Sequence, residues 1–184
     1  GDSKVMWTFR RSIPSSYSIV SVQAPTPDPI GGFSWWLVNE AQRGASSQKG
    51  MAESACNASM VISSFYEKFC SLHMLSPSKS LALGFSQGAG LLSVLAQTHP
   101  RLFQKIGLLA GFVVALDKTS VPSHSKPDIF IAHGIKDTHI SIQQAYNGRN
   151  FLEKNGYQVL FFEEGVGHKV GSQGMRQLGK WLKE

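Results

Sequence analysis

The sequence predicts an α/β fold in which helices cover both faces of a mainly parallel sheet. Along residues 81–184, short apolar runs alternate regularly with longer segments of helical pattern. The runs, such as LALGF at 81–85 and DIFIAH at 128–133, are apolar almost throughout, as expected for strands buried on both faces. With 184 residues, of which 42% are hydrophobic, the chain is long enough for one domain with a substantial core.

The first fifty residues are the least regular part of the chain. Residues 4–11 are expected to form a short helix, and residues 17–25 (YSIVSVQAP) a strand that ends at Pro25. Prolines and glycines mark residues 26–50 as a long loop or cap with a short helix.

Residues 51–74 are the longest helical candidate, because apolar side chains recur there at helical spacing, namely Val61, Phe65, Phe69 and Leu72. Both cysteines, Cys56 and Cys70, fall in this helix, about 21 Å apart along its axis. That separation excludes a disulfide between them. We therefore expect free thiols in the core and a cytoplasmic location.

The remaining strands and helices follow from apolar runs and from the turn residues between them. We expect strands at 81–85, 105–114, 128–133 and 159–162, and helices at 87–97, 142–155 and 172–183.

Composition and charge exclude several classes of protein. The net charge is +6, but the basic residues are scattered and do not alternate with aromatic residues as in a nucleic-acid groove, so we expect no nucleic-acid partner. The sequence has no apolar run long enough to span a bilayer, so we expect no stable membrane insertion. Neither cysteine lies in a metal-binding pattern, and we expect neither a metal nor a cofactor.

The motif that carries chemistry is Gly84-Phe85-Ser86-Gln87-Gly88, at the end of an apolar run. A strand, a tight turn and a helix start would expose the Ser86 hydroxyl at the top of the sheet as a nucleophile. We expect a Cβ at Gly84 or Gly88 to crowd the neighbouring strand and helix. The backbone N–H of Gln87, at the helix N-terminus, would stabilise an oxyanion.

Two more polar residues follow predicted strands, Asp137 and His168. The carboxyl ends of parallel strands meet at one edge of a sheet, so these side chains are expected to converge on Ser86. A serine hydroxyl needs an adjacent base, for which an imidazole is suited, and a carboxylate would fix the imidazole tautomer. The chain order Ser, Asp, His is that of the α/β-hydrolase triad.

Taken singly, each of these residues has an ordinary alternative: a chance glycine motif, a loop acid, a structural histidine. Among the other candidates, His133 lies inside an apolar run and suits a packed, hydrogen-bonded role. His139 has no comparable position. Glu163 and Glu164 are too close to His168 along the chain to approach it from a separate strand end.

Three motifs together resemble the phospholipase/carboxylesterase family: Gly84–Ala89 (GFSQGA), His133-Gly134-x-x-Asp137, and Gly167-His168-x-Val170. The resemblance covers most of the chain from residue 17 onward. It implies an α/β-hydrolase fold, with residues 1–184 as a single domain, and a small-molecule acyl ester or thioester as substrate. The family begins with a strand that ends in His-Gly-x-Gly-Asp, where x supplies a second oxyanion N–H. Gly1-Asp2 resembles the tail of that motif, so we expect the chain to be N-terminally truncated relative to the family and to lack its first strand or strands.

The family also implies an apolar groove for the acyl chain, for which Phe33, Trp35 and Trp36 are the candidate lining residues. The alternative is that these aromatic residues only pack the cap onto the sheet.

We therefore expect a serine hydrolase for carboxylic esters of short to medium acyl chain. One alternative is an acyl-protein or lysophospholipid thioesterase or esterase, and another is a non-catalytic binding module with a hydrolase fold. Without its first strand, the sheet would have an unpaired edge, along which a second copy of the chain could pair to form a homodimer.

Overall fold

Four parallel strands form the central sheet of the computed structural model, which describes residues 1–37, 45–76, 79–116 and 126–184. Their spatial order is the same as their order in the sequence: β3 (Leu81–Phe85), β4 (Lys105–Leu109), β5 (Asp128–Gly134) and β6 (Val159–Glu164). The predicted mainly parallel sheet is confirmed.

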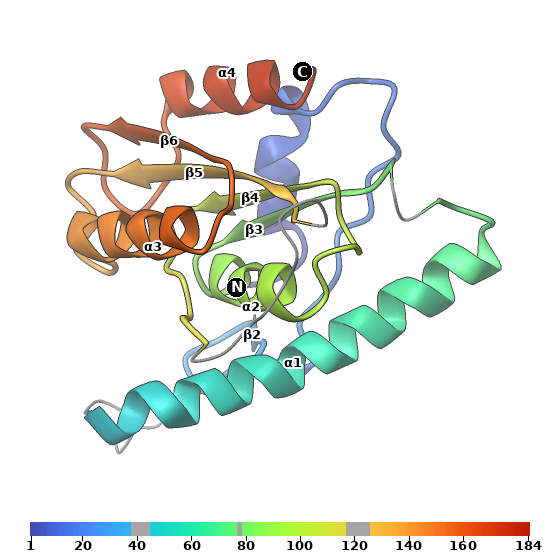
Figure 1. The fold of residues 1–184 in the computed structure, drawn as a ribbon, viewed down its shortest axis with the longest axis horizontal. Helices are drawn as coiled ribbons and strands as arrows, with labels where there is room; N and C mark the ends of the chain where they lie inside the picture. The colour runs from blue at the N-terminus through green and yellow to red at the C-terminus, as the bar shows by residue number, and fades with distance from the viewer. Residues whose placement is uncertain (38–44, 77–78, 117–125) are drawn as a thin grey trace.

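Helices cover both faces of the sheet, as Figure 1 shows. On one face lie α2 (Gln87–Thr98) and α3 (Ile142–Lys154), and on the other lie α4 (Ser172–Trp181) and the 3-10 helix η1 (Val5–Ser12). The long helix α1 (Ala45–Leu72) packs on α2 rather than on the sheet. The predicted helices agree with these within a few residues, except that α1 begins earlier than expected.

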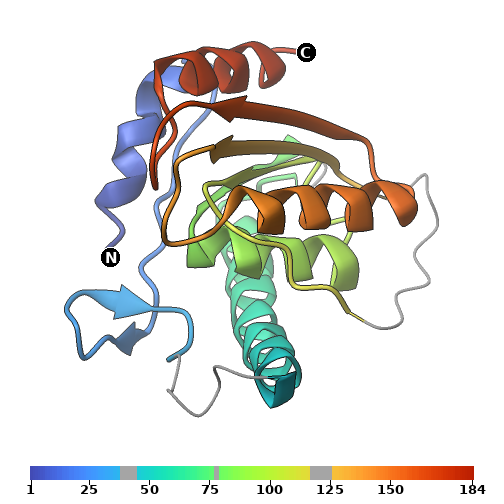
Figure 2. The ribbon, with the colours of Figure 1, turned by 90° about the vertical axis from the view of Figure 1, so that its left-hand side faces the viewer.

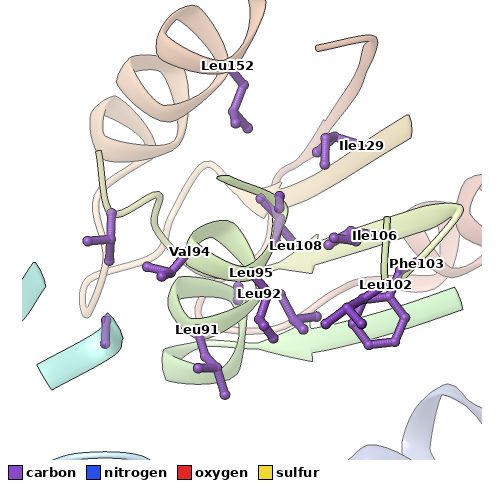
Figure 3. Packing of buried hydrophobic residues seen from close by; sticks show 14 of the residues in the cluster. Leu91, Leu92, Val94, Leu95, Leu102, Phe103, Ile106, Leu108, Ile129 and Leu152 are labelled. Atoms are coloured by element: carbon purple, nitrogen blue, oxygen red, sulfur yellow. The ribbon is translucent and has the colours of Figure 1, made fainter. Parts of the chain in front are cut away.

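The larger hydrophobic core lies between the sheet and the α2 layer. Leu92 and Leu95 of α2 and Ile106 and Leu108 of β4 are among its buried side chains, as Figure 3 shows. A second core fills the opposite face, where Phe9 of η1 and Trp181 of α4 pack with Phe130 of β5. Burial on both faces explains why the strands are apolar throughout.

The predicted strand at 17–25 is wrong. Among the described residues, the short strands β1 (Thr26–Pro27) and β2 (Phe33–Ser34) form an antiparallel hairpin instead, and residues 17–24 pair with no strand. Val20 is 53% exposed. A strand requires a hydrogen-bonded neighbour. Residues 17–24 do not pair with the open edge of β3, which is hydrogen-bonded only to β4 among the described residues. Of the segment 26–50, where a short helix is expected, residues 26–37 contain no helix, residues 45–50 belong to α1, and residues 38–44 lie outside the described residues.

The apolar spacing of α1 predicted a helix correctly, but those side chains do not form its buried face. Val61 is 57% exposed and Leu72 is 77% exposed. The buried positions are small residues, Ala55, Ala58, Ser59, Ser63 and Cys70. Two larger residues, Ile62 and Tyr66, are half-buried and pack against the larger core, whereas Val61 and Leu72 lie on the outer side. Cys56 and Cys70 are free thiols within this one helix, as predicted.

In the described part of the chain, none of the helices combines the length and the apolarity that crossing a bilayer requires.

Candidate active site

Ser86 occupies a sharp turn between β3 and α2. Its backbone has φ 54° and ψ −117°, a conformation that L residues rarely adopt and that costs about 1–3 kcal/mol. The turn is held because the Ser86 N–H donates to the Leu109 carbonyl at 2.9 Å, and the Ala89 N–H donates back to the Ser86 carbonyl at 3.0 Å. This conformation lifts the Ser86 side chain above the end of the sheet.

The two glycines that flank Ser86 differ. A Cβ on Gly84 would lie 2.8 Å from the Ala89 nitrogen and closer still to the Gly88 carbonyl, so the close approach of β3 to α2 requires glycine there. Among the described residues, a Cβ on Gly88 would meet only the Trp35 Nε1, at 3.7 Å, which is an ordinary contact. The expectation of crowding is confirmed for Gly84 and wrong for Gly88.

Backbone hydrogen bonds hold together the two loops that carry Asp137 and His168. The N–H groups of Ile135 and Lys136 donate to the carbonyls of Glu164 and Val166, each at 2.9 Å. A Cβ on Gly134 would overlap the Val166 and Gly167 carbonyls, so glycine permits this contact. The loop after β5 therefore lies directly against the loop after β6.

Ser86, His168 and Asp137 form a continuous hydrogen-bonded chain. His168 Nδ1 donates to Asp137 Oδ2 at 2.7 Å, and the Ser86 hydroxyl donates to His168 Nε2 at 3.1 Å. The Asp137 side chain is fully buried, whereas that of His168 is 20% exposed. All three residues predicted to converge on this edge of the sheet therefore do so.

The Asp137 carboxyl is kept ionised. Burial raises its pKa, but hydrogen bonds from the Ile140 N–H, the His168 ring and the His139 N–H outweigh burial, and the net effect holds the pKa of Asp137 below its ordinary value. An ionised carboxylate at this position stabilises an imidazolium at His168.

The His168 ring packs against two other rings. Phe85 is 5.1 Å from it and His139 is 5.0 Å from it, measured between ring centroids. The sequence interpretation missed His139. The available signal was its position two residues after Asp137, because that spacing lets its N–H donate to Asp137 Oδ1 at 2.9 Å.

The rival residues have other partners. His133 is buried, and its Nε2 lies 2.9 Å from the Ile140 carbonyl, which confirms the predicted packed role, although the same nitrogen also lies 3.5 Å from Asp137 Oδ2. Glu163 accepts a hydrogen bond from the Tyr146 hydroxyl, and Glu164 accepts one from the Gly174 N–H of α4.

Gln87 is the first residue of α2, so its N–H has no partner within the helix, and the helix dipole gives it partial positive charge. The neighbouring N–H of Ser86 is already bonded to Leu109. The arrangement can support nucleophilic attack by Ser86 with the developing oxyanion near the N-terminus of α2.

The model of the family described as Phospholipase/Carboxylesterase matches residues 6–184. The chain belongs to this family. It is therefore a carboxylic ester hydrolase with an α/β-hydrolase fold, and its substrates are small-molecule esters. No curated protein sequence matches it significantly.

Several solved structures share the fold of this family member. Esterase PE8 matches with a TM-score of 0.85 and 19% identity, over 100% of this chain and 86% of its own. The Bacillus cereus carboxylesterase matches with a TM-score of 0.82 and 16% identity, over 100% of this chain and 82% of its own. SOBER1 of Arabidopsis thaliana matches with a TM-score of 0.73 and 19% identity, over 100% of this chain and 92% of its own.

A cavity of about 370 Å³ lies beside the hairpin of this carboxylesterase-family chain. Its walls are Pro25, Thr26, Trp35 and Trp36 on one side and Ser54, Asn57, Ala58 and Val61 of α1 on the other. Trp36 is 7% exposed and also packs into the larger core. Phe33 is 39% exposed on β2, where its N–H donates to the Gly1 carbonyl at 2.6 Å.

The side chains of Asp137, His139 and His168 bring three potential metal-ligand atoms within 4.8 Å of one another. However, the Asp137 oxygens already accept hydrogen bonds from His139, Ile140 and His168, and both nitrogens of the His168 ring are engaged. The cluster therefore fits a hydrogen-bonded relay better than a metal site.

Proposed function

We propose that this chain hydrolyses carboxylic esters of short to medium acyl chain through an acyl-enzyme intermediate on Ser86. The observation that carries the proposal is the chain of hydrogen bonds from Ser86 through His168 to Asp137, at 3.1 and 2.7 Å. Its distances lie in the range that proton transfer between a nucleophile and its base requires.

In the first half of the reaction, Ser86 Oγ attacks the ester carbonyl carbon and its proton passes to His168 Nε2. Asp137 accepts the Nδ1–H of His168 throughout, which leaves Nε2 free to take the proton and stabilises the resulting cation. The Gln87 N–H stabilises the tetrahedral oxyanion. The bond to the leaving alcohol then breaks, and His168 returns the proton to that alcohol.

In the second half, water attacks the acyl-enzyme and gives its proton to His168. The oxyanion collapses, the bond between the acyl carbon and Ser86 Oγ breaks, and His168 returns the proton to Oγ. The products are a carboxylic acid and the regenerated enzyme.

The test is hydrolysis of p-nitrophenyl acetate and p-nitrophenyl butyrate by purified protein. Ser86→Ala removes the nucleophile, and we expect kcat to fall by ~10⁴-fold or more. Ser93→Ala is a suitable control, because Ser93 is a buried serine of α2 whose hydroxyl bonds only backbone groups. Activity of Ser86→Ala at the level of the control would contradict the mechanism.

A second candidate activity is cleavage of acyl thioesters or of lysophospholipids, and the phospholipase part of the family description favours the lysophospholipids. Turnover of a palmitoyl thioester faster than of any short p-nitrophenyl ester would select it. The alternative of a non-catalytic binding module predicts no turnover of any substrate in such a panel.

We further propose that residues 1–184 form a single domain in the cytoplasm, without a nucleic-acid partner. The free thiols Cys56 and Cys70 support the location. A homodimer could form along β3, whose outer edge has no strand partner within the described residues. Sedimentation of the purified protein tests the dimer.

A further inference from the structure

The side chain of Gln87 binds the backbone of a segment that is distant in the sequence. Its Oε1 accepts the Trp35 N–H at 2.8 Å, and its Nε2 donates to the Trp36 carbonyl at 2.7 Å. Both functional groups of the amide are therefore used on two successive residues. A glutamate could accept from Trp35 but could not donate to Trp36, and an apolar side chain could do neither.

These two bonds connect the nucleophile turn to the hairpin segment. Gln87 directly follows Ser86, and the hairpin at 26–34 leads directly into Trp35. The hairpin is also stabilised from within, because the Asp28 carboxylate accepts hydrogen bonds from the Ile30 N–H and the Ser34 hydroxyl. Asp28 therefore shapes the hairpin, while Gln87 attaches the residues that follow it to the start of α2. Figure 2 shows the hairpin lying apart from the sheet, near the N-terminus.

The attached residues form one wall of the cavity beside α1. Trp35 and Trp36 line this pocket of about 370 Å³, which is open to solvent, together with Asn57, Ala58 and Val61. The Trp35 Nε1 also lies over Gly88, 3.7 Å from where a Cβ would stand. Trp35 therefore lines the cavity and also lies beside the first turn of α2, two residues after Ser86.

We propose that Gln87 is a positioning residue that holds the Trp35–Trp36 wall in register with Ser86, and that this wall selects the acyl chain of the substrate. The inference rests on the proposed function. It adds a second role to Gln87: the backbone N–H stabilises the oxyanion, whereas the side chain sets the boundary of the acyl site. Without these two side-chain hydrogen bonds, Trp35 and Trp36 would no longer be held in position relative to Ser86. The enzyme would then discriminate less between acyl chains.

The test compares kcat/KM for p-nitrophenyl acetate, butyrate and octanoate in Gln87→Met and Gln87→Glu. Two lost hydrogen bonds correspond to a change of roughly tenfold, so we expect the preference for the best ester over the worst to shrink about tenfold in Gln87→Met. Gln87→Glu keeps one of the two bonds and should restore part of the preference.

Gln97→Met is the matched control. Gln97 lies on the same helix, is 1% exposed, and also bonds backbone groups through both ends of its amide, at Val114 and Leu116. We expect this variant to lower the Tm and to leave the acyl-chain preference as in the wild type. A merely structural role for Gln87 would make the two variants behave alike.

A double-mutant cycle with Trp35→Ala tests whether Gln87 acts through the wall. If it does, Gln87→Met should change the acyl-chain preference much less in the Trp35→Ala background than in the wild type. Additive effects, or a fall in kcat/KM by the same factor for all three esters, would overturn the inference. Failure of the proposed function itself would be recognised separately, because the wild type would then turn over none of the esters or Ser86→Ala would retain the activity of the wild type.

Discussion

Replacing Gly84 and Gly88 singly by alanine should have opposite effects on stability, although both glycines flank Ser86 in the same motif. A Cβ on Gly84 would push against the Gly88 carbonyl and the Ala89 nitrogen, which are backbone atoms at the start of α2 and cannot rotate away. Overpacking of this kind costs about 1–3 kcal/mol, and contact with backbone places Gly84→Ala at the upper end of that range. The displaced helix start would also move the Gln87 N–H, so kcat should fall as well.

Within the part of the chain that the structure describes, a Cβ on Gly88 meets only the Trp35 ring at an ordinary distance, and Gly88 lies within α2. Alanine is better than glycine in a helix by about 0.5–1 kcal/mol, so Gly88→Ala should be neutral or more stable than the wild type. The two variants should then differ by about 3–4 kcal/mol, or roughly 10 °C in Tm for a chain of this size.

Urea unfolding followed by circular dichroism measures this difference, provided that the slope with denaturant is unchanged among the variants. A Gly84→Ala protein as stable as the wild type would refute the argument from close approach of β3 and α2. A Gly88→Ala protein as unstable as Gly84→Ala would refute the distinction between the two sites.

Three further predictions concern the residues of the hydrogen-bonded chain. Glycine relieves the positive φ of Ser86, so Ser86→Gly should be more stable than Ser86→Ala by about 1 kcal/mol in urea unfolding; equal or lower stability would argue against strain at the turn. Asp137→Asn cannot hold His168 in the same tautomer, and kcat for p-nitrophenyl butyrate should fall ~10⁴-fold, whereas a loss below tenfold would remove Asp137 from the mechanism. Because the pKa of Asp137 is lower in the folded state, its ionised form stabilises the fold above pH ~4. That contribution is lost as the pH falls through the folded pKa, so the stability advantage of the wild type over Asp137→Asn should shrink as the pH is lowered below ~4, and an advantage that grows on acidification would contradict a lowered pKa.

The sheet and its helices could be predicted from sequence because burial on both faces leaves a strong pattern. The strand 81–85 is predicted with the bounds that the structure gives it, and the later strands and helices agree within a few residues, apart from β4, which ends at Leu109 rather than 114. The segment 17–25 has an equally strong strand pattern. It forms no strand because pairing depends on a neighbour, which local composition does not report.

Helix α1 shows a different limit of sequence patterns. Val61, Phe65, Phe69 and Leu72 predicted a helix from their spacing, but spacing alone does not determine which face is buried. The close packing of α1 on α2 selects Ala55 and Ala58 for the interface, because larger side chains would separate the two helices.

The candidate site was predictable to the extent that strand ends determine it. Ser86, Asp137 and His168 each follow a parallel strand, so their convergence follows from topology. The contact between Gln87 and Trp35 could not be predicted, because it joins residues far apart in the sequence through backbone groups that every residue carries.

The most direct test of the account is reaction of the native protein with a fluorophosphonate probe, with the modified residue identified by mass spectrometry. The account predicts a single labelled serine, Ser86, and labelling that is lost in His168→Ala, because the hydroxyl is reactive only beside its base. Labelling at another serine, or equal labelling of Ser86 in the absence of His168, would contradict it.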